Sequence, residues 1–204
     1  MKRLFAVLLT LSTVGGLLAA DLDLPAPRKT GGMPLMEALA RRATGRAIDT
    51  RELSPQQLAN LFWAGFGVNR PDGRRTAPSA SNYQEIEIYA LLRSGAYVYD
   101  AVQHRLRQVA VDDLRALGGQ PEAPVTLLYV ADLSKRTKGT VESKKAIACI
   151  DSGFISENIY LFCASEGLAT GYRGHYDEKA LAPKLNLRPD QTLIAAQSVG
   201  YPKP

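Results

Sequence analysis

Alternating hydrophobic and polar residues mark the strands of this chain. In residues 85–92 (EIEIYALL) the apolar positions recur every second residue, which predicts a β-strand with one buried face. Residues 96–100 and 104–109 follow at the spacing of a hairpin, and the apolar, β-branched run 124–130 predicts a central strand. Residues 193–199 predict a final buried strand. The pattern therefore predicts a sheet whose strands come from the middle and the end of the chain.

Helical spacing of apolar residues marks three other segments. Residues 34–42 predict a short helix, and Ser54 followed by Pro55 predicts the capped start of a second one. Residues 146–166 carry two apolar stripes, so we expect a helix that is buried on most sides. Either a domain of this size buries such a helix internally, or two copies of the chain pack together on it.

Both cysteines fall on this long predicted helix. Cys149 and Cys163 would lie about 21 Å apart along its axis. A disulfide needs Cα atoms closer than about 7 Å. We therefore expect two free, buried thiols.

The N-terminal residues 1–20 have the pattern of a signal peptide. Two basic residues precede an apolar run, which ends in small residues at Ala20. The alternative is a membrane anchor, but the run is short for a span of about 20 residues and two glycines interrupt it. We expect cleavage after Ala20, a periplasmic or secreted protein, and no stable membrane anchor. Residues 21–33 predict an extended arm, and residues 34–204 a single domain.

Composition and motifs narrow the function. The net charge of +5 comes from scattered Arg and Lys rather than a basic stripe with stacking aromatic residues, so no nucleic-acid partner is expected. No metal-ligand spacing, nucleophile elbow or P-loop is present, and we expect no catalytic side chain and no metal site. His104 and His175 are expected to be loop histidines without a catalytic role, and Trp63 a core aromatic residue. Such a chain suits a cofactor that carries the chemistry itself.

Three separated stretches carry candidate binding residues. In residues 41–46 (RRATGR), arginines flank a hydroxyl group and could clamp a phosphate, or could simply complement the dipole of a helix end. Residues 78–82 (PSASN) form a tight polar loop that could lie against a flat ring system, or an ordinary Ser/Asn-rich loop. Gly167 follows the long helix, where it allows a close backbone approach or acts as a plain helix cap.

These three stretches resemble those of the nitroreductase family of FMN-dependent flavoproteins. Residues 61–89 (LFWAGFGVNRPDGRRTAPSASNYQEIEIY) are most similar to the branch of thiazoline and oxazoline dehydrogenases. Ala43 departs from the family pattern, where an arginine is usual, and this could weaken the grip on the phosphate. The resemblance implies FMN contacts at Arg42, Thr44 and Arg46 (phosphate), at Pro78, Ser79, Ala80 and Asn82 (ring), and at Glu166, Gly167 and Leu168 (backbone beside the ring).

The resemblance also implies an architecture and an activity. It implies an α+β, nitroreductase-like fold with a mainly antiparallel sheet flanked by helices. It implies a homodimer with the long helix at the interface, where residues 78–82 reach the flavin of the other subunit. The activity would be ping-pong transfer of hydride through flavin N5, to or from a small organic substrate. The alternative is a flavin-binding or interaction protein with the same fold and little or no turnover.

Overall fold

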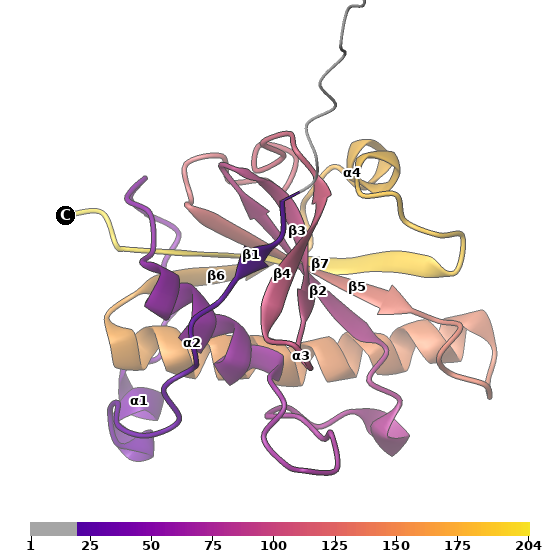
Figure 1. Cartoon of the computed structure of the whole chain (residues 1–204), viewed down its shortest axis with the longest axis horizontal. Coiled ribbons are helices and arrows are strands. Elements are labelled where there is room, and N and C mark those ends of the chain that lie inside the picture. The colour runs from indigo at the N-terminus through magenta and orange to yellow at the C-terminus, as the bar shows by residue number, and fades with distance from the viewer. Residues whose placement is uncertain (1–19) are drawn as a thin grey trace, which may run out of the picture.

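Within residues 20–204, the fold consists of one seven-stranded sheet and four helices (Figure 1). The computed structural model describes residues 20–204, so the predicted signal peptide lies outside the described residues except for Ala20. The helices are α1 (Leu35–Arg41), α2 (Pro55–Phe66), α3 (Val141–Glu166) and α4 (Glu178–Lys184), with a 3₁₀ turn η1 (Ala80–Asn82). The strands are β1 (Leu22–Asp23), β2 (Ile86–Leu92), β3 (Gly95–Asp100), β4 (Arg105–Ala110), β5 (Val125–Asp132), β6 (Ala169–Arg173) and β7 (Gln191–Gly200).

All neighbouring strands in the sheet are antiparallel, in the order β1-β4-β3-β2-β5-β7-β6. The predicted α+β class, the hairpin of β3 and β4, and the central position of β5 are thus confirmed. Local pattern succeeds here because sequential strands joined by short turns pair with each other.

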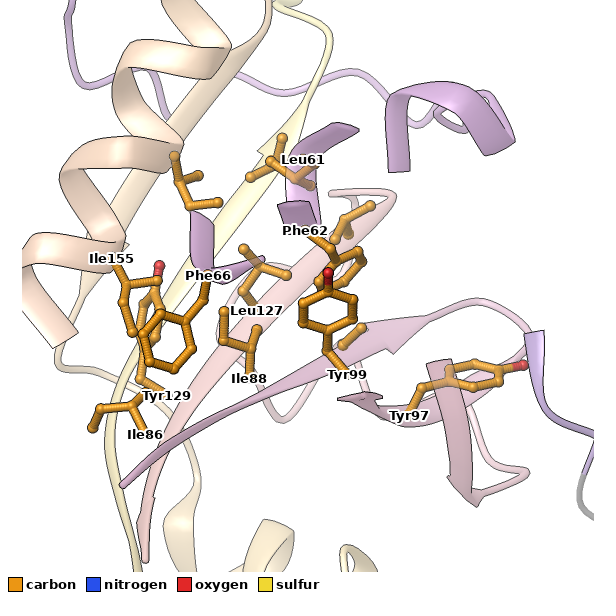
Figure 2. Packing of buried hydrophobic residues seen from close by; sticks show 14 of the residues in the cluster. Leu61, Phe62, Phe66, Ile86, Ile88, Tyr97, Tyr99, Leu127, Tyr129 and Ile155 are labelled. Carbon is orange, nitrogen blue, oxygen red and sulfur yellow. The ribbon is translucent and has the colours of Figure 1, made fainter. Parts of the chain in front are cut away.

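The two faces of the central strands are both buried, which corrects the expectation of one buried face for residues 85–92. On one face Ile88 and Leu127 pack with Phe62 of α2 and Ile155 of α3, as Figure 2 shows. On the other face, a second buried cluster joins the strands to α4 and to the segment around Leu114. Its strand residues are Tyr89, Leu91, Leu128 and Val130, and the residues that cover them include Leu114, Leu181 and Leu185. The period-two pattern could not reveal this second layer, because β2 ends at Leu92 and α4 begins only at Glu178.

Helix α3 runs along one face of the sheet, where it contacts β2, β5, β7 and β6 (Figure 1). It begins at Val141, five residues earlier than predicted, because the Thr140 side chain accepts a hydrogen bond from the Ser143 N–H and caps it. Its inner face is buried on the sheet, whereas Ile150 and Phe154 on the outer face are 58% and 45% exposed. Within one chain the expectation of burial on most sides is therefore wrong. By length and composition alone, α3 could also span a membrane. Such a match is weak evidence for a membrane span, because a core helix of a soluble protein gives the same result.

The two cysteines of this helix differ in exposure. Both are free, as expected, and Cys163 is buried. Cys149 is exposed, so the prediction of two buried thiols is wrong for this residue. It shares the outer face of α3 with Ile150.

The N-terminal arm is integrated into the fold. Leu22 and Asp23 pair with β4 as the edge strand β1. The chain then passes along α2 and reaches α1, as the indigo segment of Figure 1 shows. The Arg28 N–H donates to Asn60 Oδ1 of α2 at 2.8 Å, so the arm is extended but fixed in place.

Candidate functional site

The first candidate stretch, at the end of α1, lies against α3. The guanidinium carbon of Arg42 is 5.5 Å from the centroid of the Tyr160 ring. The Thr44 and Tyr160 hydroxyl oxygens are 3.1 Å apart, and the Tyr160 hydroxyl also accepts from the Tyr172 N–H at 3.0 Å. The sequence-predicted Arg42 and Thr44 are thus held together by one tyrosine.

Arg46 lies near Arg42 and Thr44 because residues 44–46 run beside β6. The Gly45 N–H donates to Thr170 O at 2.9 Å, which lays the backbone before Arg46 along that strand. A Cβ added at Gly171 would lie 3.4 Å from Arg46 Cγ. The side chain of Arg46 therefore passes directly over β6.

Arg173 adds a third cation that sequence reasoning missed. It lies at the end of β6 and donates to Gly118 O at 3.3 Å and to Gln120 Oε1. Partial burial lowers the pKa of Arg173, and the neighbouring Arg46 cation lowers it further. No local pattern links residue 173 to residue 46, because only the path of β6 beside residues 44–46 brings them together.

These three arginines have no acidic partner within the described chain. Arg42, Arg46 and Arg173 form no ion pair with any carboxylate among residues 20–204. Clustered cations without anions repel one another, and a bound phosphate would relieve that repulsion through charge-assisted hydrogen bonds. The Thr44 hydroxyl supplies a further hydrogen-bonding group at the same place. We refer to Arg42, Thr44, Arg46 and Arg173 as the arginine cluster.

The third candidate stretch caps α3. Gly167 has φ 67° in the left-handed region, as expected for a helix C-cap. The N–H groups of Gly167 and Leu168 both donate to Cys163 O, and a Cβ added at Gly167 would have no atom within 4 Å. Glu166 and Gly167 are exposed, whereas Leu168 is buried. The cap therefore presents open space to a ligand, while these two N–H groups are already paired.

The second candidate stretch, residues 78–82, lies elsewhere on α3. The Ala80 N–H donates to Asp151 Oδ2 at 2.9 Å. Asp151 and Tyr160 are nine positions apart, which is about 14 Å of helix. Ser81 and Asn82 both have φ 55°, so the loop is held in a left-handed conformation that non-glycine residues rarely adopt. One chain alone does not bring Pro78, Ser79, Ala80 and Asn82 to the arginine cluster.

A buried ionic group beneath this loop was also missed from the sequence. Glu85 is fully buried and pairs with Arg136 at 3.2 Å. Arg136 also donates to Ala80 O at 3.3 Å, and the Ser79 hydroxyl donates to Glu85 Oε2 at 3.1 Å. Asp151 completes the group from α3. The alternating pattern of residues 85–92 predicts Glu85 on the solvent side of the strand. It could not reveal the buried ion pair, because the partner Arg136 follows 51 residues later.

The raised pKa of the Asp151 carboxyl group predicts how the stability of the fold depends on pH. Burial raises the pKa of Asp151 and nearby Glu85 raises it further, against the opposing effect of the Ala80 N–H. A raised carboxyl pKa stabilises the fold at low pH, and this stabilisation is lost as pH rises through the folded-state pKa. In Asp151→Asn an oxygen remains for Ala80, but nothing titrates.

The free energy of unfolding of wild type should therefore fall relative to Asp151→Asn as pH rises above about 3.9, the ordinary pKa of an aspartate. Urea unfolding at several pH values measures this difference. The control is Asp112→Asn, which removes an exposed carboxylate that pairs with Lys184 at 3.5 Å. A constant difference between wild type and Asp151→Asn at every pH would contradict the prediction.

Other candidate chemistry contributes little. Among residues 20–204, no group of three or more His, Cys, Asp or Glu is placed to hold a metal. His104 Nδ1 lies 2.9 Å from the Tyr99 hydroxyl, and burial lowers the pKa of His104. Trp63, expected in the core, is only half-buried and lines a cavity beside the N-terminal arm.

Comparison with known proteins agrees with this fold. The family model described as "Nitroreductase family" matches residues 39–201. A curated protein of Methanocaldococcus jannaschii, whose name places it with the nitroreductases, is 23% identical over 76% of this chain and 85% of its own length. A crystal structure from Ralstonia eutropha, also described as a nitroreductase, is 35% identical, with a TM-score of 0.85 over 94% of this chain and 97% of that chain.

A more distant similarity shows the fold alone. A chain of the Escherichia coli microcin synthetase McbBCD complex is 17% identical, with a TM-score of 0.71 over 99% of this chain and 85% of that chain. The family match spans most of the sequence and includes the arginine cluster, residues 78–82 and the cap of α3. The chain belongs to the nitroreductase family.

Proposed function

We propose that this protein is an FMN-dependent oxidoreductase acting on a small organic substrate. The observation that carries the proposal is the arginine cluster, in which three arginines and the Thr44 hydroxyl lie beside Tyr160 and β6. None of the three arginines pairs with a carboxylate of residues 20–204. The donors of the cluster fit the phosphate of FMN, and the open side of Gly167 fits the edge of a ring. When bound, FMN would supply hydride transfer through its N5 atom, to or from the substrate.

The residues of this chain then bind and orient. Arg42, Arg46 and Arg173 hold the phosphate by charge, and Thr44 adds a hydrogen bond. The turn of Glu166, Gly167 and Leu168 lies beside the ring. Donor and acceptor substrates occupy the same site in turn, which is a ping-pong scheme.

Replacing Arg46 by Ala tests the phosphate site. One charged hydrogen bond contributes about 1.5–3 kcal/mol, so the dissociation constant for FMN should rise at least tenfold. Titration of FMN fluorescence measures it. Arg41→Ala is the matched control, since Arg41 is already paired with Glu37 and should leave the affinity unchanged. Equal affinities of Arg46→Ala and wild type would contradict this placement.

We further propose a homodimer that completes the site. The exposed apolar side chains include Ile150 and Phe154 on α3, and Leu35, Met36 and Leu39 on α1. Helices α1 and α3 contact each other, so these residues lie on two adjacent helices. Such a surface on two adjacent helices suits a second copy of the chain. The loop of Pro78, Ser79, Ala80 and Asn82 would reach the flavin of the partner, which explains its distance from the arginine cluster of its own chain.

Two finer assignments complete the proposal. Residues 61–89 support membership of the thiazoline and oxazoline dehydrogenase branch. Residues 1–20 support export and a periplasmic or secreted location. Both rest on the sequence.

A second candidate function is a flavin-binding or interaction protein with little or no turnover. Ala43 favours it, because it stands where the family usually has an arginine. Steady-state kinetics with FMN-loaded protein separate the two. Turnover with a ping-pong pattern supports the oxidoreductase, and tight FMN binding without turnover supports the second candidate.

A further inference from the structure

A cavity of about 400 Å³ lies between the N-terminal arm, α2 and α3. Arg28 and Lys29 of the arm line it on one side, and Trp63 of α2 and Phe162 of α3 line it on others. Its volume falls within the range of about 300–1,000 Å³ that is usual for small-molecule sites. Glu166, in the turn expected beside the flavin, belongs to the same lining.

The arm forms a fixed wall of this cavity. On one side of Lys29, the Arg28 N–H donates to Asn60 Oδ1 of α2 at 2.8 Å. Beyond it, the Met33 N–H donates to Ser165 Oγ of α3 at 2.8 Å. Gly32, with φ 85°, makes the turn between them, and a Cβ there would lie 3.0 Å from Ser165 Oγ. The arm is therefore tied to both helices, with the two basic side chains between the ties.

The two basic side chains that line the cavity have no acidic partner in the described chain. Neither Arg28 nor Lys29 forms an ion pair with a carboxylate of residues 20–204. Lys29 Nζ lies 5.8 Å from the centroid of the Trp63 ring. A flat aromatic surface thus adjoins an ammonium group whose donors are free, which suits a ligand with a ring and a negative charge.

We propose that this cavity binds an aromatic carboxylate as the substrate of the enzyme. The carboxylate pairs with Lys29 and Arg28, and the ring packs on Trp63 and extends toward the cap of α3. Glu166 repels an anion, which directs the carboxylate to the opposite, basic end. The role as substrate site rests on the proposed function, whereas binding of the carboxylate does not need FMN.

The first experiment measures binding to the full chain without FMN. Trp63 is the single tryptophan, so its emission reports on this cavity directly. The probes are 4-nitrobenzoate and the neutral 4-nitrobenzyl alcohol, which share the quenching ring and differ in charge. Saturable quenching should be roughly tenfold tighter for 4-nitrobenzoate, and Lys29→Gln should abolish that preference. Lys138→Gln, with the same charge change at an exposed site, should keep it.

Equal affinities for the two probes, an unchanged preference in Lys29→Gln, or no saturable quenching would each overturn the anion site.

A second experiment tests the substrate role, with FMN-loaded protein reduced beforehand by dithionite. The nitro group of each probe then accepts a hydride and a proton, an N–O bond breaks, water leaves, and a nitroso product forms while FMN is oxidised. Return of the FMN absorbance measures the rate.

The rate with 4-nitrobenzoate at low concentration should fall roughly tenfold in Lys29→Gln, and the rate with 4-nitrobenzyl alcohol should not change. Equal effects on both rates would overturn the substrate role. Failure of the protein to bind FMN overturns the proposed function and the substrate role with it. The binding experiment would still decide whether the anion site exists.

Discussion

Replacing Arg136 by Met is expected to lower the free energy of unfolding by about 3–5 kcal/mol. Arg136 and its partner Glu85 are both buried, with side chains 7% and 0% exposed. Without the guanidinium group, the Glu85 carboxylate would stay buried beside Asp151 with no cation to compensate it. The Ala80 carbonyl would also lose a donor, so residues 78–82 would lose part of the support for their left-handed conformation.

Urea unfolding of the variant measures this loss. Arg93→Met is the control, because Arg93 and Glu52 form an exposed pair, and it should cost less than about 1 kcal/mol. The double variant Glu85→Gln, Arg136→Met removes both charges and should recover much of the stability. Equal losses in Arg136→Met and Arg93→Met would show that the buried pair does not support the fold.

Replacing Phe154 by Glu is expected to separate the proposed dimer. Fully burying a phenylalanine side chain contributes about 1.5–3 kcal/mol, and Phe154 is 45% exposed in one chain, so the interface would gain about half of that from each copy. A symmetric interface contains this residue twice, so the dimer dissociation constant should rise by about 10–10²-fold, before the cost of burying a charge. Because the loop of one subunit completes the site of the other, FMN affinity should fall with it.

Sedimentation at micromolar concentration, with and without FMN, measures both effects. Val102→Glu is the matched control, since Val102 is 81% exposed in the turn between β3 and β4. It should leave the dimer intact. A wild-type protein that is monomeric with FMN bound, or a Phe154→Glu variant that remains dimeric, would contradict the proposed interface.

The sequence predicted elements better than it predicted their surroundings. The strand at residues 86–92 and the cap at Gly167 follow from neighbours a few positions apart, and both are present. What covers a strand or helix depends on distant segments. Helix α4 buries the second face of β2, and the outer face of α3 is exposed to solvent. The hydrophobic pattern of β2 and α3 predicted neither result.

The same limit applies to the site. Arg42, Thr44 and Arg46 stand out because they are close together in the sequence, and Tyr160 does hold the first two in one place. Arg173 reaches them only through the path of β6. Arg136 reaches the loop at Ala80 only after β5 has crossed the sheet. Residues that meet through the sheet leave no local pattern.

The central claim is that the arginine cluster holds the phosphate of FMN. Its most direct test is an absorption titration of FMN with wild type and with the double variant in which Arg42 and Arg46 are both replaced by Ala. If the arginine cluster holds the phosphate, wild type should shift the visible FMN bands and saturate at one FMN per chain. The double variant should bind at least a hundredfold more weakly, on the scale of about 3 kcal/mol for two charged contacts. Saturation of both proteins at the same FMN concentration, or no spectral change with wild type, would contradict the account.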